Sequence, residues 1–322
     1  MERNSMTGGV LMKKWNLDKV SAGWRHVLCC LVWMLMAAQA VQAQDAVPLC
    51  PMPDRVTAGS DTLPVCSMRT DTIAVPRLTY PAAFWQLADN VLTDSLGILK
   101  PFWEQLRLRH IGVVTDTLRI VHVGDSHIRG HIFPRTVGEA MQRDFGTISY
   151  TDVGINGAFC ITFTRPDRVD KIADLHPDLL ILSFGTNESH NRRYNSMTHY
   201  KQMDDLVRML RERLPEVPML MTTPPGSYES FRQSRRRRTY KINPRTDRTV
   251  QTIRRYADDN GLAVWDLYNI AGGVRRACLN WQEAGLMRPD HVHYLPEGYR
   301  LQGEMLYQAL LKAYNDYCMG IR

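Results

Sequence analysis

The sequence lacks the features that define several classes of protein. It has no internal repeats, and its only low-complexity tract is one short run of arginines. Its longest apolar stretch, VLCCLVWMLMAAQAV, has about 15 residues, which is short for a helix that crosses a bilayer. Basic residues are not interleaved with aromatic ones and no binding module for nucleic acid is recognisable, so we expect no nucleic-acid partner. The 322 residues are 44% hydrophobic, which is enough to fill a large core and typical of a globular chain.

The N-terminus has the order of features of a secretory signal. Four Lys or Arg residues between positions 13 and 25 precede the apolar stretch, which ends on the small-residue pattern Val41-Gln42-Ala43. This order predicts a signal peptide over residues 1–43 and a secreted or periplasmic protein with no stable membrane span once the signal is cut. An uncleaved membrane anchor is the alternative, and Met12 is an alternative start.

Cysteine is scarce, and its number is odd beyond the signal. Cys29 and Cys30 lie within residues 1–43, which leaves five cysteines and at least one of them unpaired. Cys50 and Cys66 lie close together in a Pro-rich segment bound for an oxidising compartment. These two form the candidate disulfide.

Much of the positive charge lies in one place. The formal charge is +7, and removal of residues 1–43, which hold five Lys or Arg and two Asp or Glu, leaves +4. Arg235 to Arg238 form an unbroken basic run. We expect this run to be a solvated loop, and a contact for an anionic polymer is the alternative.

Strand and helix patterns alternate from residue 118 onward. Several strand patterns are apolar almost throughout, as strands buried on both sides should be, and the alternation predicts an α/β fold. We expect three layers: a central parallel sheet of about five strands with helices on both faces. The expected strands cover 118–124, 148–154, 178–185, 217–223 and 262–267, and the expected helices cover 134–144, 167–175, 197–214, 246–259 and 296–317.

A less regular part precedes this domain. Residues 44–112 are predicted to be a linker followed by a helical extension, which packs on the main domain. The extension would contain helices near 82–92 and 94–106, although a glycine and a proline interrupt the second pattern. The main domain is then expected over 113–322.

Polar clusters occur at four places along the main domain. Residues 124–127 (GDSH) follow the first expected strand, 154–157 (GING) the second and 185–188 (GTNE) the third, whereas 288–299 (RPDHVHYLPEGY) precede the last helix. In open parallel sheets, ligands bind beyond the carboxyl ends of the strands. We therefore expect the four clusters to meet at one edge of the sheet.

This edge contains the parts needed to activate a serine. The hydroxyl of Ser126 requires a base to take its proton and a third group to orient that base. Asp290 and His293 lie three residues apart, so on a turn the carboxylate can hold the imidazole in the required tautomer. His127 is a weaker candidate for the base, because it adjoins Ser126 in the chain and would reach the hydroxyl awkwardly.

A tetrahedral oxyanion requires preorganised donors. The candidates are the backbone N–H groups of Ser126 and Gly157 and the side-chain amide of Asn187; glycine suits a place where backbone must approach substrate. Taken alone, each residue also has a structural interpretation: Gly154 and Gly157 as turn glycines, Asn187 as a turn residue and Asp290 as a helix N-cap. Their order and their common edge favour the catalytic interpretation.

The four clusters together resemble the four blocks of the SGNH (GDSL-type) hydrolases: GDS, GINGA, GTNE and DHVH. The resemblance covers roughly the last 200 residues and implies a flavodoxin-like SGNH fold over the catalytic domain. It implies that Ser126, His293 and Asp290 form a catalytic triad. It also implies that Gly157 and Asn187 complete the oxyanion hole with the Ser126 N–H group, since Gly157 matches the second block better than Gly154 does.

One departure from the family pattern concerns the substrate. The first block reads GDSH rather than GDSL, and GDSHI is similar to the opening of bacterial peptidoglycan O-acetylesterases and related periplasmic O-acyl esterases. This similarity implies a secreted esterase that removes short acyl groups, above all O-acetyl, from a cell-wall or other polysaccharide. Larger members of that group carry a carbohydrate-binding-like domain, for which the short segment between GINGA and GTNE has no room. The candidate substrate contacts are His127, Arg129, Glu188 and Arg193.

The sequence leaves three alternatives open. A broader lipase, a thioesterase or an O-acyltransferase would use the same fold. A metal-dependent phosphoesterase would use Asp125, His127, Asn187, Glu188, His291 and His293, but the sequence lacks a bridging Gly-Asp segment and a Gly-Asn-His-Asp/Glu block. A protein that only binds glycan is disfavoured, because all five expected catalytic positions are filled. We expect no cofactor and no metal, and the oligomeric state stays open.

Overall fold

The computed structural model describes residues 71–235 and 237–321. The predicted signal peptide (1–43) and the candidate disulfide between Cys50 and Cys66 lie outside these residues. The cysteines of the described part, Cys160, Cys278 and Cys318, have free thiols. Within the same part, every helix is too short or too polar to cross a bilayer.

A six-stranded sheet forms the centre of the described chain, in the order β1-β8-β5-β4-β2-β3. All neighbouring strands are parallel except β1, which pairs antiparallel with β8. The predicted parallel sheet of about five strands is confirmed, and β1 adds a short antiparallel edge. The strands are β1 (Leu92–Thr93), β2 (Leu118–Gly124), β3 (Ile148–Gly154), β4 (Leu179–Ser183), β5 (Met219–Thr222) and β8 (Ala263–Trp265).

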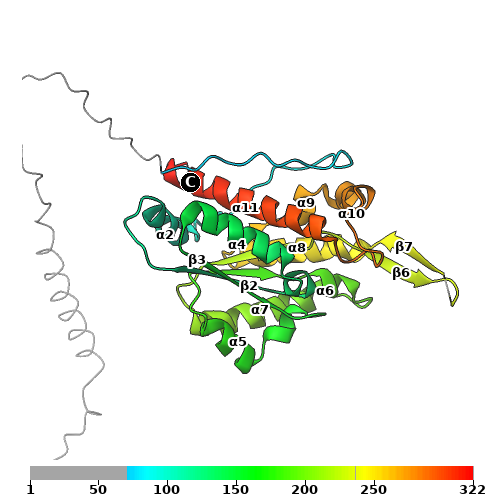
Figure 1. The fold of residues 1–322 in the computed structure, drawn as a ribbon. Coiled ribbons are helices and arrows are strands. Elements are labelled where there is room, and N and C mark those ends of the chain that lie inside the picture. Colours follow the sequence, from blue (N-terminus) through cyan, green and yellow to red (C-terminus); the bar gives the residue numbers. More distant parts are fainter. Residues whose placement is uncertain (1–70, 236, 322) are drawn as a thin grey trace, which may run out of the picture. The chain divides into compact units, whose positions relative to one another are not determined.

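Helices cover both faces of this sheet and form two separate cores (Figure 1). On one face α2, α4 and α11 bury Ile120, Ile181 and Leu220; on the other α5, α7 and α8 bury Val121 and Leu182. The alternation of inward side chains explains why these strands are apolar along their whole length. The helices are α2 (Lys100–His110), α4 (Ile132–Phe145), α5 (Pro166–Ala173), α7 (Ser196–Arg213), α8 (Pro244–Asp259), α9 (Leu267–Ile270), α10 (Gly273–Glu283) and α11 (Pro296–Cys318).

The contact between α4 and α11 depends on a glycine. A Cβ atom on Gly303 would lie 2.6 Å from Cβ of Thr136 and 2.9 Å from the carbonyl oxygen of Phe133. Only a residue without a side chain lets the two helix backbones come this close. The close approach of the last helix brings its N-terminal end, and the segment before it, toward the carboxyl end of β2.

The prediction of a helix over 82–92 is wrong, and the helix predicted over 94–106 begins later. Residues 81–91 form turns and irregular chain, and the Asn90 side chain donates to the carbonyl of Met305 in α11. The carboxylate of Asp94 accepts hydrogen bonds from the N–H groups of Ile98 and Leu99, which closes a turn ahead of α2. Helix α2 therefore starts at Lys100, with a proline in its first turn.

A two-stranded hairpin, β6 (Tyr228–Arg232) and β7 (Arg238–Ile242), extends beyond the layers of helices and sheet (Figure 1). The arginine run, predicted to be a solvated loop, lies partly in the turn of this hairpin and partly in β7. Arg235, Arg237 and Arg238 are exposed. These three arginines are thus solvated, but they belong to a hairpin rather than to an irregular loop.

Candidate active site

Ser126 occupies a position that the sheet itself determines. It is the first residue of α3 (Ser126–Arg129), which begins immediately after β2, and its side chain is half-buried. Asp125 caps this short helix, because its carboxylate accepts a hydrogen bond of 2.9 Å from the backbone N–H of His127. A Cβ atom on Gly124 would lie 2.6 Å from the carbonyl oxygen of Ser183 in β4, so the strand must turn there without a side chain.

Two hydrogen bonds join Ser126 to residues far along the chain. The Oγ of Ser126 lies 2.9 Å from Nε2 of His293, and Nδ1 of His293 lies 3.0 Å from Oδ2 of Asp290. The side chains of His293 and Asp290 are 31% and 49% exposed. The structure thus brings the three residues together in the order hydroxyl, imidazole, carboxylate.

The Asp290 carboxylate is fixed by the turn on which it lies. Its Oδ1 accepts hydrogen bonds from the backbone N–H groups of Val292 (2.8 Å) and His293 (2.9 Å). Partial burial by itself would raise the pKa of Asp290, but these two bonds and the His293 side chain outweigh it and lower the pKa below its ordinary value. The carboxylate therefore stays ionised and can stabilise a positive charge on His293.

The segment that carries Asp290 and His293 is held by the β6–β7 hairpin. The N–H of Tyr228 donates to the carbonyl of His291, and the ring of Tyr240 packs 4.2 Å from the His291 ring between centroids. The hydroxyl of Tyr294 donates to the carbonyl of Gly226 just before the hairpin. This support was not predicted from the sequence, although the aromatic runs YESFR and RTYKI on either side of a polar turn are typical of a hairpin.

Gly154 and Gly157 have different structural roles. A Cβ atom on Gly154 would lie 2.2 Å from the backbone nitrogen of Arg129, so this glycine allows β3 and α3 to touch. Gly157 has φ +70°, and a Cβ atom added to it would meet no other atom within 4 Å. It is therefore exposed backbone in the left-handed region, which favours glycine.

Asn187, in α6 (Thr186–His190), connects three of the four polar clusters. Its Nδ2 donates to the carbonyl of Ala158 at 2.9 Å, next to Gly157, and lies 3.4 Å from Oδ2 of Asp125. The first contact uses one amide hydrogen, whereas the second is longer than an ordinary hydrogen bond. The amide is thus placed beside both the Ser126 cluster and the Gly157 loop.

The side chains of Glu188 and His127 are buried. The carboxylate of Glu188 accepts hydrogen bonds from the N–H groups of Cys160 (2.7 Å) and Gly185 (2.9 Å), and burial raises its pKa despite them. The His127 ring is buried behind His293, with Nδ1 3.0 Å from the Tyr299 hydroxyl. Burial, followed by the charge of His293, lowers the pKa of His127 to about 3. The expectation that these two residues contact substrate does not fit their burial.

The two candidate arginines are exposed. Arg129 contacts the ring of His131, whose Nδ1 lies 2.6 Å from Oδ2 of Asp152. Arg193 borders a cavity of about 110 Å³ that Glu188 also lines. Of the two, Arg129 lies on the same short helix as Ser126.

The side chains of the alternative metal-dependent mechanism have other partners. The carboxylate of Asp125 caps α3, and burial raises its pKa to about 8, with a smaller contribution from the charge of Glu188. His291 packs between Tyr228 and Tyr240, while His293 binds Ser126. Within the described part of the chain, no three of the His, Asp and Glu residues of this set bring ligand atoms within 4.8 Å of one another, as the ligands of a metal ion would.

The sequence and the fold each match known proteins. The sequence profile of the GDSL-like lipase/acylhydrolase family matches residues 122–301. None of the curated proteins compared with the chain matches it. A solved structure described as a peptidoglycan O-acetylesterase in action is 19% identical, with a TM-score of 0.61 over 72% of this chain and 100% of that chain.

Two further solved structures are similar over a smaller share of the chain. A GDSL-like lipase from Bacteroides thetaiotaomicron VPI-5482 is 18% identical, with a TM-score of 0.45 over 66% of this chain and 99% of that one. A carbohydrate esterase family 3 protein from Talaromyces cellulolyticus is 13% identical, with a TM-score of 0.46 over 62% of this chain and 99% of that one. At these identities, the overlap of the O-acetylesterase structure supports a common fold.

Proposed function

Because the chain belongs to the GDSL-like lipase/acylhydrolase family and is an ester-bond hydrolase, we propose that it removes short acyl groups from a carbohydrate through Ser126, His293 and Asp290. The observation that carries this proposal is the pair of hydrogen bonds, 2.9 and 3.0 Å long, from Ser126 through His293 to Asp290. Both lengths lie within the reach required of a nucleophile, its base and the group that orients the base.

The reaction follows from this arrangement. His293 takes the proton of the Ser126 hydroxyl as the oxygen attacks the ester carbonyl, and Asp290 stabilises the imidazolium that forms. The alcohol leaves with the proton from His293, and an acyl group stays on Ser126. Water, deprotonated by His293, then releases the acid. His293 acts in its neutral form, in which Nε2 can accept the Ser126 proton.

Three donors are proposed for the oxyanion: the N–H groups of Ser126 and Gly157 and the amide of Asn187. The exposed left-handed backbone of Gly157 supports this set, and so do the contacts of Asn187 with Ala158, next to Gly157, and with Asp125, next to Ser126. The second amide hydrogen of Asn187, held only by the 3.4 Å contact with Asp125, is the one that would turn to the substrate oxygen.

We propose an O-acetylated polysaccharide as the carrier of the ester. The side chains of Ser126 and His293 are half-exposed, which supports an ester carried on a polymer. The similarity to the structure described as a peptidoglycan O-acetylesterase agrees with such a substrate. A lipase, thioesterase or O-acyltransferase is the second candidate. The signal peptide over 1–43, secretion to the periplasm or beyond, and the division at residue 112 belong to the same proposal.

Acetate release tests the reaction and the substrate together. Wild type, Ser126→Ala and the exposed control Ser95→Ala are incubated with O-acetylated peptidoglycan and with acetylated xylan. We expect wild type and the control to release acetate, and Ser126→Ala to lose about 10⁴-fold or more in rate. Full activity of Ser126→Ala, or glycan binding by an inactive wild type, would contradict the proposal.

The acyl preference has its own test. We expect p-nitrophenyl acetate to be cleaved much faster than the butyrate and octanoate esters, because the segment between Ser126 and Asn187 contains no long apolar lid. Equal rates for the three esters would overturn the acetyl preference and favour the lipase or thioesterase alternative.

A further inference from the structure

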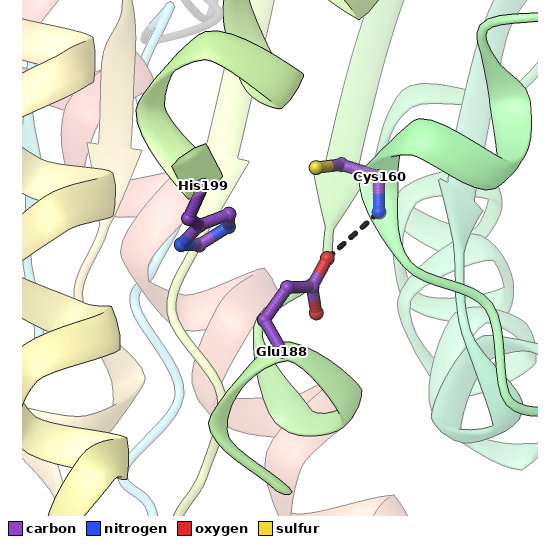
Figure 2. A group of neighbouring side chains, drawn as sticks. All are labelled: Cys160, Glu188 and His199. Carbon is purple, nitrogen blue, oxygen red and sulfur yellow. Dashed lines mark hydrogen bonds between the residues drawn. The ribbon is translucent and has the colours of Figure 1, made fainter. Parts of the chain in front are cut away.

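Three buried side chains outside the Ser126 site form a cluster of metal-ligating types. Cys160, Glu188 and His199 each present one ligand atom within 4.8 Å of the other two (Figure 2). Their exposed fractions are 1%, 2% and 2%. They come from three elements, namely η3 (Cys160–Phe163), α6 and α7, so the fold rather than the local sequence brings them together.

The tautomer of His199 leaves a lone pair directed into the protein. The Thr252 hydroxyl donates to the carbonyl of Arg248 (2.7 Å), and the Tyr194 hydroxyl donates to Thr252 (2.8 Å). The Tyr194 oxygen, 3.1 Å from Nδ1 of His199, must therefore accept a hydrogen bond from that nitrogen. The proton is on Nδ1, and Nε2 is an acceptor. Histidines that bind metals usually donate their other ring N–H in this way.

The Nε2 atom of His199 is buried and has no hydrogen-bond partner among the described residues. A buried acceptor without a partner costs free energy, and such atoms are rare in folded proteins. The Cys160 thiol can donate to Glu188, but that contact leaves Nε2 of His199 unsatisfied. A cation between the three side chains would satisfy all of them.

Two backbone hydrogen bonds orient the carboxylate of Glu188, as is usual for carboxylates that bind metals. Its two oxygens accept the backbone N–H groups of Cys160 and Gly185, which fixes the plane of the group. Each oxygen retains a lone pair, since a carboxylate can accept about four hydrogen bonds or metal contacts. Cys160 and Glu188 therefore belong to one rigid unit, and His199 faces it from α7 (Figure 2).

We propose that Cys160, Glu188 and His199 bind a divalent transition-metal ion, of which Zn²⁺ fits best. A thiolate and a carboxylate carry two negative charges, which a divalent cation neutralises, and a mixed S, O, N set favours Zn²⁺ over Mg²⁺ or Ca²⁺. Ligand atoms around tetrahedral zinc lie about 3.3 to 3.8 Å apart. Since the three ligand atoms here lie within 4.8 Å of one another, they would approach one another by at most about 1 to 1.5 Å on binding the ion. The fourth position would face the cavity of about 110 Å³ that Glu188 and His199 line.

The ion would act as a clamp on two loops. Cys160 follows the Gly157 loop by three residues, and Glu188 is the neighbour of Asn187. Binding therefore ties together the two segments that carry the proposed oxyanion donors. The sequence led to the expectation of no metal. These three residues lie 28 and 11 positions apart in the chain, a spacing that matches no metal-binding motif, so the sequence pattern does not indicate the site.

Metal content and thermal stability test the site without reference to esterase activity. The purified chain is stripped with a chelator, dialysed, and titrated with ZnCl₂ or MgCl₂. We expect about one bound zinc per chain by elemental analysis and a rise in Tm of about 5 °C or more at saturating zinc, with no rise in magnesium. Cys160→Ser and His199→Gln should each lose both effects, whereas the control Cys278→Ser, which alters another buried thiol, should keep them.

A cobalt spectrum of the wild type tests the site even if a variant folds poorly. Co²⁺ bound to wild type through Cys160 should give a thiolate charge-transfer band in the near ultraviolet, which Cys278→Ser retains. Absence of zinc binding and of this band in wild type would overturn the proposal. Binding that survives both Cys160→Ser and His199→Gln would also overturn it, since the ion would then lie elsewhere. Neither result depends on whether Ser126 is the nucleophile.

Discussion

The two sides of the candidate active site are built differently. Ser126 follows a buried strand, and close backbone contacts at Gly124 and Gly154 determine its position. Asp290 and His293 lie on a partly exposed turn, which depends on its own hydrogen bonds and on the β6–β7 hairpin. The core thus positions the proposed nucleophile, whereas a peripheral element positions the proposed base. Damage to the first side should reduce stability, and damage to the second should reduce rate.

The largest effect on stability is expected at Gly154. Gly154→Ala places a Cβ atom 2.2 Å from the backbone of Arg129, which must move, so we expect a loss of about 3 kcal/mol or more in the free energy of unfolding. Gly157→Ala meets no neighbour and should cost only about 1 kcal/mol of left-handed strain. Urea unfolding of the two variants measures the difference in the free energy of unfolding. Equal losses would contradict the different roles of the two glycines.

For Asp290, on the side of the proposed base, we expect a loss of rate with little loss of stability. Asp290→Asn can still accept the N–H groups of Val292 and His293, so the turn should fold, but the charge that stabilises the imidazolium is lost. We expect kcat to fall about 10²- to 10⁴-fold with little change in Tm. A large fall in Tm would show that this turn is as much part of the core as β2 is.

The pH dependence of stability tests the burial of Asp125, which lies on the Ser126 side of the site. Burial raises the pKa of Asp125 to about 8, from about 4 in an unfolded chain. Between these values the folded state keeps a proton that the unfolded state has released, so the Asp125 contribution to stability falls as pH rises from about 4 to about 8. Asp125→Asn caps α3 equally well and cannot ionise.

We therefore expect Asp125→Asn to be more stable than wild type at pH 9, by on the order of a few kcal/mol. The advantage should shrink at pH 5, where wild type is largely protonated in the folded state. Urea unfolding of both proteins at the two pH values gives the difference. The same difference at pH 5 and pH 9 would contradict the buried, proton-binding carboxyl.

The smallest effect is expected in the hairpin. Tyr240→Ala removes the ring that packs on His291, and we expect kcat to fall only a few-fold, about 2- to 10-fold, because the backbone bond from Tyr228 to His291 remains. Phe231→Ala, which alters an aromatic residue of the same hairpin outside this contact, is the matched control. Equal effects of the two variants would mean that the hairpin acts as a whole and not through His291.

The sheet and the polar edge could be predicted because both follow from local pattern. Strands buried on two faces are apolar runs such as LLIL, and the residues that follow them are the ones that chemistry requires at the carboxyl edge. The meeting of Ser126 with His293 was predictable as a consequence of this topology. The hairpin contacts that hold the segment of Asp290 and His293 were not predicted.

The remaining features depend on contacts between distant residues. The segment around Asn90 is irregular because its side chain binds α11, and no local pattern records that bond. The burial of His127 behind His293 and the hairpin that holds His291 are likewise tertiary facts. The cluster of Cys160, Glu188 and His199 has no spacing that would reveal it, since three separate elements supply it.

Covalent labelling tests the central claim most directly, namely that the core presents Ser126 as a nucleophile to the base on the peripheral turn. Wild type, Ser126→Ala and His293→Ala are treated with a fluorophosphonate and analysed by intact mass and peptide mapping. The account predicts one adduct on Ser126 in wild type, none in Ser126→Ala and much slower labelling in His293→Ala. An active enzyme that is unlabelled at Ser126, or labelled at another residue, would contradict it.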